Sequence, residues 1–295
     1  MKKFVYVIGF VLFIAVLSMG ELQAQEAKPG YNPNSEFPVH ESQIMFKKEL
    51  WWRMDLREKQ NQPFYAINGE LPTLLVKAVK AGLLFPYMND SLTNRMSKEM
   101  FLENLKLPEE GGGLTEEEKA MGFGADQGAS DWGASDWGGG GAAAPAGGGE
   151  AAAPAALEFN TRDFSIFELR EDWYFDRNRS RMYHDIQALS MFLPADKNPA
   201  LYEKPIASFR YKDIVDLFAT MPDEAVWYNA QNMAEHRKMS DAFLLRLFSA
   251  TLVKYSNPQD QRIIDVYSKS QKEGVLASQR LEYELVDFEN ELWEY

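Results

Sequence analysis

The chain has 295 residues, no cysteine and a formal net charge of −13. This acidic balance argues against a nucleic-acid partner, because phosphates require a basic surface. The lack of cysteine excludes disulfides, catalysis by a thiol and a lipid anchor on a cysteine.

The first residues resemble an export signal. Lys2 and Lys3 precede an apolar run over residues 4–19, which is shorter than a membrane-spanning helix. Small or apolar residues then offer a signal peptidase site, so we expect residues 1–24 to be a signal peptide cleaved after Ala24. An uncleaved membrane anchor is the alternative. Export without a lipid anchor predicts a periplasmic protein.

The next segments differ in their predicted structure. Residues 25–38 contain three prolines and predict an extended lead-in. Residues 39–110 predict a small α-rich unit, although the pattern over residues 39–52 fits either helix or strand. A helix is expected over residues 71–83, where apolar residues recur at helical spacing and Pro72 occupies the first turn, and a second over residues 91–107.

Residues 111–156 are dominated by glycine and alanine and predict a flexible linker, because they offer little apolar surface to bury. Within it, "GASDWGASDWGGGG" (residues 128–141) lacks the second glycine of a serine nucleophile elbow, and "GFGADQG" misses the dinucleotide fingerprint. Asp126, Asp131 and Asp136 recur every five residues, but they lack the spacing of a calcium loop. We interpret the repeat as a spacer.

Residues 157–295 predict a larger region with both strands and helices. Aromatic and β-branched residues indicate strands over 164–176 and 182–195, joined as a hairpin, and a third strand over 208–219. A helix is expected over 239–248 and a strand over 249–258. A C-terminal amphipathic helix follows from the apolar positions Leu281, Leu285, Phe288, Leu292 and Tyr295.

The predicted fold class is therefore α+β. It comprises a small helical N-terminal unit, a disordered Gly/Ala-rich insert, and a larger mixed C-terminal region that ends in the amphipathic helix. That helix carries six acidic residues and no basic residue after Arg280. They form either the solvated face of an ordinary helix or a docking surface for a partner with a basic groove.

Tests for catalytic chemistry give no candidate. His40, His184 and His236 have no carboxylate or histidine partner at zinc-like spacing. No spacing distinguishes a pair of carboxylates for hydrolysis. We therefore predict no catalytic residue, no cofactor and no metal ligand.

Three short motifs occur in order along the chain. "MDLREKQNQP" begins at Met54, "EDWYFD" at Glu171 and "RLFS" at Arg246, and the last is followed by Asn257 and by "RIIDVY" from Arg262. In an exported chain without cysteine, this combination resembles the gliding-motility protein GldN, called PorN in non-gliding relatives. The resemblance covers about residues 40 to 270, although Met54 stands where isoleucine is expected and the long insert is unexpected. The motif residues that it singles out are Asp55, Arg57, Asn61, Pro63, Trp173, Phe175, Asp176, Arg246, Phe248, Ser249 and Asn257.

The resemblance implies a non-catalytic periplasmic component of the type IX secretion system. Such a protein assembles with an outer-membrane lipoprotein of the GldK or PorK type into a large ring, and contacts the periplasmic part of a GldM- or PorM-type motor. The alternatives are a periplasmic protein that binds glycan or peptidoglycan through exposed aromatic residues, and a metal-dependent hydrolase.

The motif residues themselves predict structural roles. Asp55 and Arg57 pair either with each other or with a partner subunit, and Trp173 and Phe175 belong to the core. Arg246, expected on a helix, has the planar donors to bind a carboxylate through two hydrogen bonds.

Overall fold

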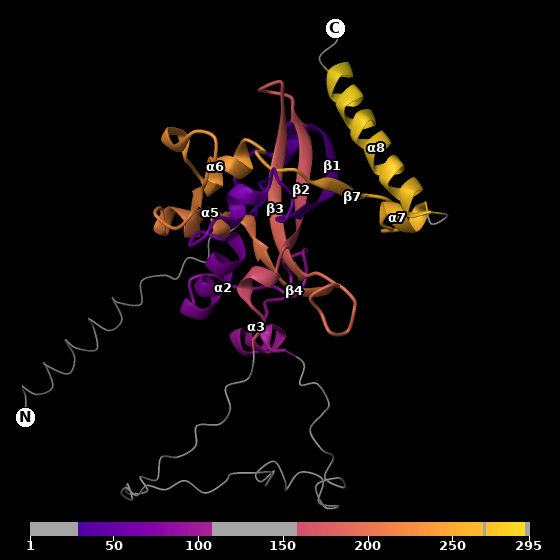
Figure 1. Ribbon diagram of the computed structural model, residues 1–295. Coiled ribbons are helices and arrows are strands. Elements are labelled where there is room, and N and C mark those ends of the chain that lie inside the picture. Colours follow the sequence, from indigo (N-terminus) through magenta and orange to yellow (C-terminus); the bar gives the residue numbers. More distant parts are fainter. Residues whose placement is uncertain (1–28, 108–157, 268–269, 293–295) are drawn as a thin grey trace, which may run out of the picture.

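The computed structural model describes residues 29–107, 158–267 and 270–292. The predicted signal peptide and the predicted Gly/Ala-rich linker lie outside these ranges. A five-stranded antiparallel sheet, with strand order β4-β3-β2-β1-β7, forms the centre of the fold (Figure 1). Its strands are β1 (Ile44–Asp55), β2 (Ile166–Asp176), β3 (Arg181–Leu193), β4 (Lys204–Arg210) and β7 (Thr251–Tyr255). The predicted α+β class is confirmed.

The ambiguous segment over residues 39–52 forms a strand rather than a helix. β1 pairs with β2 along almost its whole length and with β7 on its other edge. The segment expected to be α-rich therefore supplies a strand inside the sheet, between two strands that follow the insert. The division of the chain into units at residues 110 and 157 stays a prediction.

The two ends of the insert are neighbours in the fold. Lys106 and Glu158 form an isolated antiparallel bridge, and the amide of Phe159 donates to the carbonyl of Leu105 at 2.9 Å. The intervening residues therefore leave and re-enter the described structure at almost the same point.

The predicted hairpin and the strand over residues 249–258 are present as β2–β3 and β7. The third predicted strand, over residues 208–219, is largely wrong: β4 ends at Arg210, and α5 (Tyr211–Thr220) follows directly. Ile214, Leu217 and Phe218 recur at helical spacing and are buried. This periodicity outweighs the β-branched and aromatic composition on which the prediction depended.

The remaining elements are mostly helical. They are α2 (Leu71–Ala81), α3 (Lys98–Leu105), α6 (Met239–Leu244), α7 (Ile263–Val266) and α8 (Gln271–Glu291), a two-stranded ribbon of β5 (Val226–Trp227) and β6 (Arg237–Lys238), and short 3-10 turns η1 (Glu41–Gln43), η2 (Gln62–Tyr65), η3 (Thr161–Asp163) and η4 (Met233–Glu235). None of the helices in the described ranges is long and apolar enough to span a bilayer.

Helix boundaries follow local signals. α2 has Pro72 in its first turn and ends at Gly82, whose φ of 77° suits a residue without Cβ. α3 begins later than predicted, because the side chain of Ser97 accepts from the amide of Met100 and caps the helix there.

Two hydrophobic clusters lie next to each other on one face of the sheet, because Leu50 and Met54 of β1, which belong to different clusters, point to the same side. The larger includes residues of α2, α3, α5 and α6 packed against β1 to β4, and the smaller lies under α8. In the smaller cluster, Leu50, Trp173 and Leu252 contact the predicted apolar face of α8 through Leu281, Leu285 and Phe288. Trp52 is half-buried and packs against both clusters.

Candidate functional site

The second and third motif segments meet where the two hydrophobic clusters join, beside the strand that leads into the first motif. Leu50 of β1 lies directly opposite Glu171 of β2, and Trp52 is the next residue on the same side of β1. The loop that follows α6 crosses this point, because Arg246 pairs with Glu171 and its guanidinium lies 5.2 Å from the ring of Trp52. We call Glu171, Arg246, Trp52 and His184 the carboxylate junction.

Glu171 is the centre of the carboxylate junction and has an exposed fraction of 0%. Its Oε2 lies 2.5 Å from Nη1 of Arg246, and its Oε1 accepts from the indole nitrogen of Trp52. Nδ1 of His184, on β3, lies 3.3 Å from the same Oε1. Both carboxylate oxygens are therefore satisfied, which a buried charge requires.

These contacts decide the ionisation of Glu171. Burial by itself raises the pKa of this carboxyl, but the hydrogen bond from His184 and the positive charge of Arg246 outweigh burial and hold the pKa below its usual value. Glu171 is therefore a carboxylate at neutral pH, with the guanidinium of Arg246 as a positive charge beside it.

Arg246 does not lie on a helix, contrary to the prediction. α6 ends at Leu244, and Arg246 has a left-handed φ of 51°. The amide of Leu247 donates to Ala242 and that of Arg246 to Phe243, the pattern of a helix end that usually carries glycine. A residue with a side chain is strained there, and the ion pair with Glu171 gives a physical reason for it. One guanidinium nitrogen, not two, contacts the carboxylate.

Asn61 joins the first motif to the third. Its side-chain nitrogen donates to the carbonyls of Asp55 and Ser249, both at 2.8 Å, and its oxygen accepts from the amide of Ser249 at 2.8 Å. Asn61 is fully buried, so water does not compete for these groups. The contribution of Ser249 to this link comes from its backbone.

Asp55 and Arg57 pair with each other, one of the two alternatives that the sequence left open. Nε and Nη2 of Arg57 donate to the two carboxylate oxygens of Asp55, and Nη1 reaches Asp196 at 3.1 Å. Arg57 is exposed, so these ion pairs contribute little stability. Pro63 is the second residue of the 3-10 turn η2, a position at which no backbone N–H is needed as a donor.

The other motif residues shape the fold locally. Trp173 and Phe175 are buried in β2, and Phe248 packs against Phe243. Asp176 accepts from the amides of Asn178 and Arg179 and fixes the β2–β3 turn. Asn257 plays the same part after β7, where it binds the carbonyls of Tyr255 and Gln261.

The sequence analysis missed three members of the carboxylate junction. Glu171 was quoted in a motif but not selected, although a glutamate within a run of aromatic residues on a strand signals a buried charge that needs a partner. His184 lies directly opposite Trp173 across the hairpin, so the hairpin, not sequence spacing, brings it to Glu171. Trp52 gave no separate signal.

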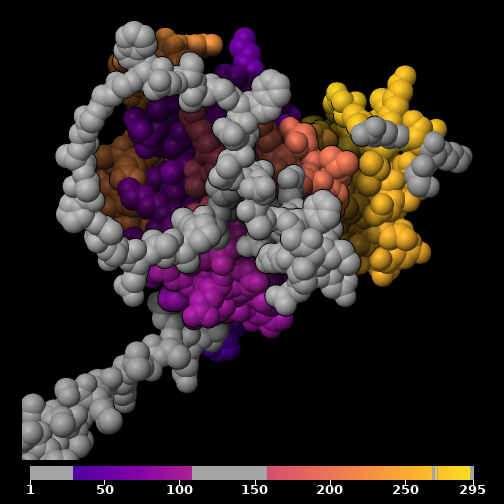
Figure 2. Space-filling model, turned by 60° about the horizontal axis from the view of Figure 1, so that its bottom comes forward, coloured from indigo at the N-terminus to yellow at the C-terminus, as the bar shows by residue number. Residues whose placement is uncertain are grey.

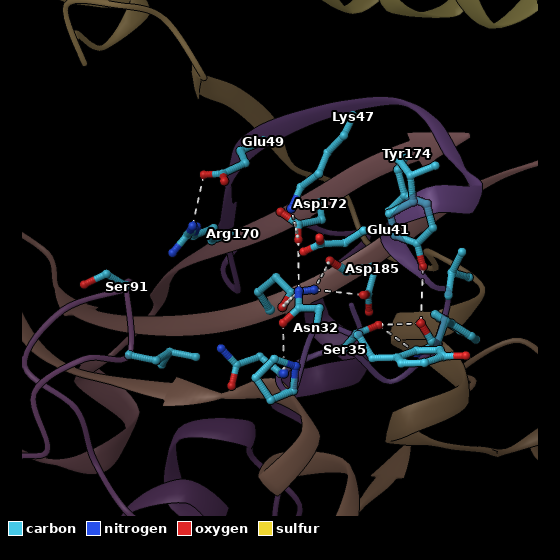
Figure 3. A pocket seen from close by; sticks show the side chains of 18 residues that line it. Asn32, Ser35, Glu41, Lys47, Glu49, Ser91, Arg170, Asp172, Tyr174 and Asp185 are labelled. Carbon is cyan, nitrogen blue, oxygen red and sulfur yellow. Dashed lines mark hydrogen bonds and ion pairs between the residues drawn. The ribbon is translucent and has the colours of Figure 1, made fainter. Parts of the chain in front are cut away.

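A second feature is a polar cleft of about 520 Å³ on the other side of β1 and β2 (Figure 3). The described part of the lead-in is bonded to β2 and β3 and lines one side of the cleft. Asn32 donates to Asp172 at 3.2 Å and to Gln187 at 2.9 Å, and Lys47 forms an ion pair with Asp172 at 2.9 Å. Asp185 lies directly opposite Asp172 across β2 and β3, so the fold brings together two carboxyl groups that no sequence spacing related.

The carboxyl groups of Asp172 and Asp185 are both buried, and burial shifts the pKa of each. Burial raises the pKa of Asp185 to about 7. Burial also raises the pKa of Asp172, although Lys47 opposes the shift. Within the described ranges, no three histidine, aspartate or glutamate side chains are grouped so that they could hold a metal ion.

Comparison with known proteins identifies the family. The model of the family described as gliding motility associated protein GldN matches residues 39–294, a range that includes all three motifs. No curated protein matches the chain. The chain belongs to the family of the gliding motility associated protein GldN.

Proposed function

We propose that this chain is a non-catalytic structural component of the type IX secretion machinery in the periplasm. The observation that carries the proposal is the family match over residues 39–294, which associates the chain with gliding motility and type IX secretion. In the proposed role, the protein assembles with an outer-membrane lipoprotein of the GldK or PorK type into a ring. It also contacts the periplasmic part of a GldM- or PorM-type motor.

The use of the motif residues supports a structural role for them. Asn61 and Arg246 each connect segments far apart in the chain and face buried partners rather than the polar cleft. We propose that the motifs maintain the fold whose surface assembles, and that they are not themselves a ligand site.

Deletion of the gene tests the proposal. We expect the deletion to abolish export of the system's cargo and to destabilise the lipoprotein partner, with both restored by the full-length chain in trans. Normal secretion in the deletion strain would contradict the proposed function.

One observation favours the glycan-binding alternative. The polar cleft brings together the carboxyl, amide and guanidinium groups of Asp172, Asn32 and Arg170, a set that can hydrogen-bond to the hydroxyl groups of a sugar. Sedimentation of the purified protein with isolated sacculi, compared with capture by the lipoprotein, separates the two functions. Binding to sacculi alone would favour the alternative.

A further inference from the structure

α8 carries an apolar face that no other part of the described structure covers. Its inner face packs on β7 and β1 through the smaller hydrophobic cluster. On the opposite side, four large apolar side chains form what we call the outer stripe: Val275, Leu276, Tyr283 and Val286. Their spacings of seven, eight and eleven residues place them along one side of a helix with 3.6 residues per turn.

The outer stripe is exposed to a degree that packing within the chain does not explain. Tyr283 has an exposed fraction of 72%, and the other three have fractions near one half. α8 stands beside the sheet rather than within the body, and Figure 2 shows its yellow surface uncovered along one edge (Figures 1 and 2). Exposed large apolar side chains gathered on one side of a helix mark an interaction site.

Acidic residues border the C-terminal part of the outer stripe, beyond Arg280, on both sides. Helical geometry puts Glu282 and Glu289 along one border, and Asp287 and Glu291 along the other. Glu282 accepts from the amide of Leu252 and so holds α8 to β7. Among the ion pairs of the described residues, none involves Asp287, Glu289 or Glu291. These three charges are therefore available to a partner.

We propose that the outer stripe of α8 docks into an apolar groove of a different protein whose rims carry lysine or arginine. The acidic borders indicate a basic partner rather than a second copy of this chain. Two copies that packed through the same face would bring their acidic borders together, which costs free energy. The "SDWGASDWG" segment of the insert would likewise bring Asp131 and Asp136 to acidic borders. A helix that inserts its apolar side into a groove, with complementary charges at the edges, satisfies both features. This assignment rests on the proposed function, because it gives one surface of the chain to a protein partner of the assembly.

Site-specific photo-crosslinking tests the proposal in cells that produce the full-length chain. Benzoylphenylalanine replaces Tyr283 in one strain. In the control strain it replaces Leu201, which lies in the β3–β4 loop and has an exposed fraction of 80%. We expect position 283, but not 201, to crosslink to a different protein, at an apolar peptide with neighbouring lysine or arginine. A crosslink to a second copy, to residues 108–157, or none above the control would overturn the proposal.

Charge reversal tests the borders separately. Asp287→Lys with Glu289→Lys is expected to remove the crosslink, whereas Asp223→Lys with Glu235→Lys makes the same change in net charge at exposed positions away from α8 and leaves it. Lysine-to-glutamate changes at the crosslinked partner peptide should restore it. Tyr283→Ser with Val286→Ser should weaken the complex at least about tenfold, because two apolar contacts are lost. Circular dichroism of each purified variant checks that α8 is retained.

The outcomes of this test and of the gene deletion are distinguishable. A crosslink to a basic apolar groove together with normal secretion in the deletion strain would support docking by α8 and contradict the secretion role. Loss of secretion without a crosslink from position 283 would do the reverse.

Discussion

The ion pair between Arg246 and Glu171 gives a quantitative prediction. Arg246→Met keeps a long apolar stem over Trp52 and removes the charge, while Glu171 stays fully buried. Removing one partner of a buried ion pair leaves an uncompensated charge and costs about 3–5 kcal/mol. We expect the lower end, about 3 kcal/mol, because Trp52 and His184 still bond to Glu171. A loss of this size is a large fraction of the 5–15 kcal/mol that stabilises a typical domain.

Urea unfolding at pH 7, followed by tryptophan fluorescence, measures this cost as a shift of the midpoint at constant slope. Glu171→Gln is the matched variant, because it removes the charge but retains an oxygen for Trp52. It should cost about 1–2 kcal/mol, since the partly exposed Arg246 can turn to water. The double variant Arg246→Met with Glu171→Gln should be more stable than Arg246→Met alone. A buried charge pair would be refuted if the two single variants lost equal stability, or if the loss in the double variant were the sum of the two single losses.

The sign of the pH dependence gives a second test of the same pair. In the wild-type protein the pKa of Glu171 is lowered, so its contribution to stability is complete above its unfolded value of 4.5 and is lost as the pH falls below it. In Arg246→Met, burial is no longer opposed by the guanidinium and raises that pKa. The cost of the substitution should therefore shrink as the pH falls from 7 toward 4.5. A cost that grows over this range would contradict the assignment.

Three further predictions concern other parts of the fold. Asn61→Ala should lower the free energy of unfolding in urea by about 2–4 kcal/mol, because buried backbone groups lose their partners. Asn257→Ala, in a loop that water reaches, should lower it by about 1 kcal/mol. Similar losses would contradict a buried link between Asn61 and Ser249. The pKa of Asp185 is about 7 in the folded state against an ordinary value of 3.8, so the folded state holds an extra proton between these pH values, and this group lowers the free energy of unfolding as the pH rises from 4 to 7. Asp185→Asn should flatten this dependence of stability on pH, and an unchanged dependence would argue against the shift. Replacement of residues 108–157 by a short glycine-serine turn should raise stability by about 2 kcal/mol through lower loop entropy, and deletion of residues 124–149 should leave secretion largely intact; complete loss of secretion would give the tryptophans of the insert a specific role.

Local patterns predicted much of the secondary structure and the family. The hairpin strands, α2, β7 and α8 follow from periodicity, aromatic content and turn residues that act within a few positions of each other. The error over residues 208–219 arose where β-branched composition and helical spacing conflicted, and burial of Ile214 and Phe218 decided for the helix. The motif residues were named from the sequence, but not what they contact.

The sequence by itself determined the α+β class, the acidic character of α8 and membership of the GldN family, because each depends on composition or on local order. Only the tertiary structure decided that β1 lies between β2 and β7, and that Arg246 and Asn61 each connect distant segments. Strand pairing and buried hydrogen bonds join residues far apart in the chain, such as Trp52 and Glu171, which are 119 positions apart. Their choice depends on which arrangement buries the most apolar surface while it satisfies every buried polar group, and no local window of sequence contains that information.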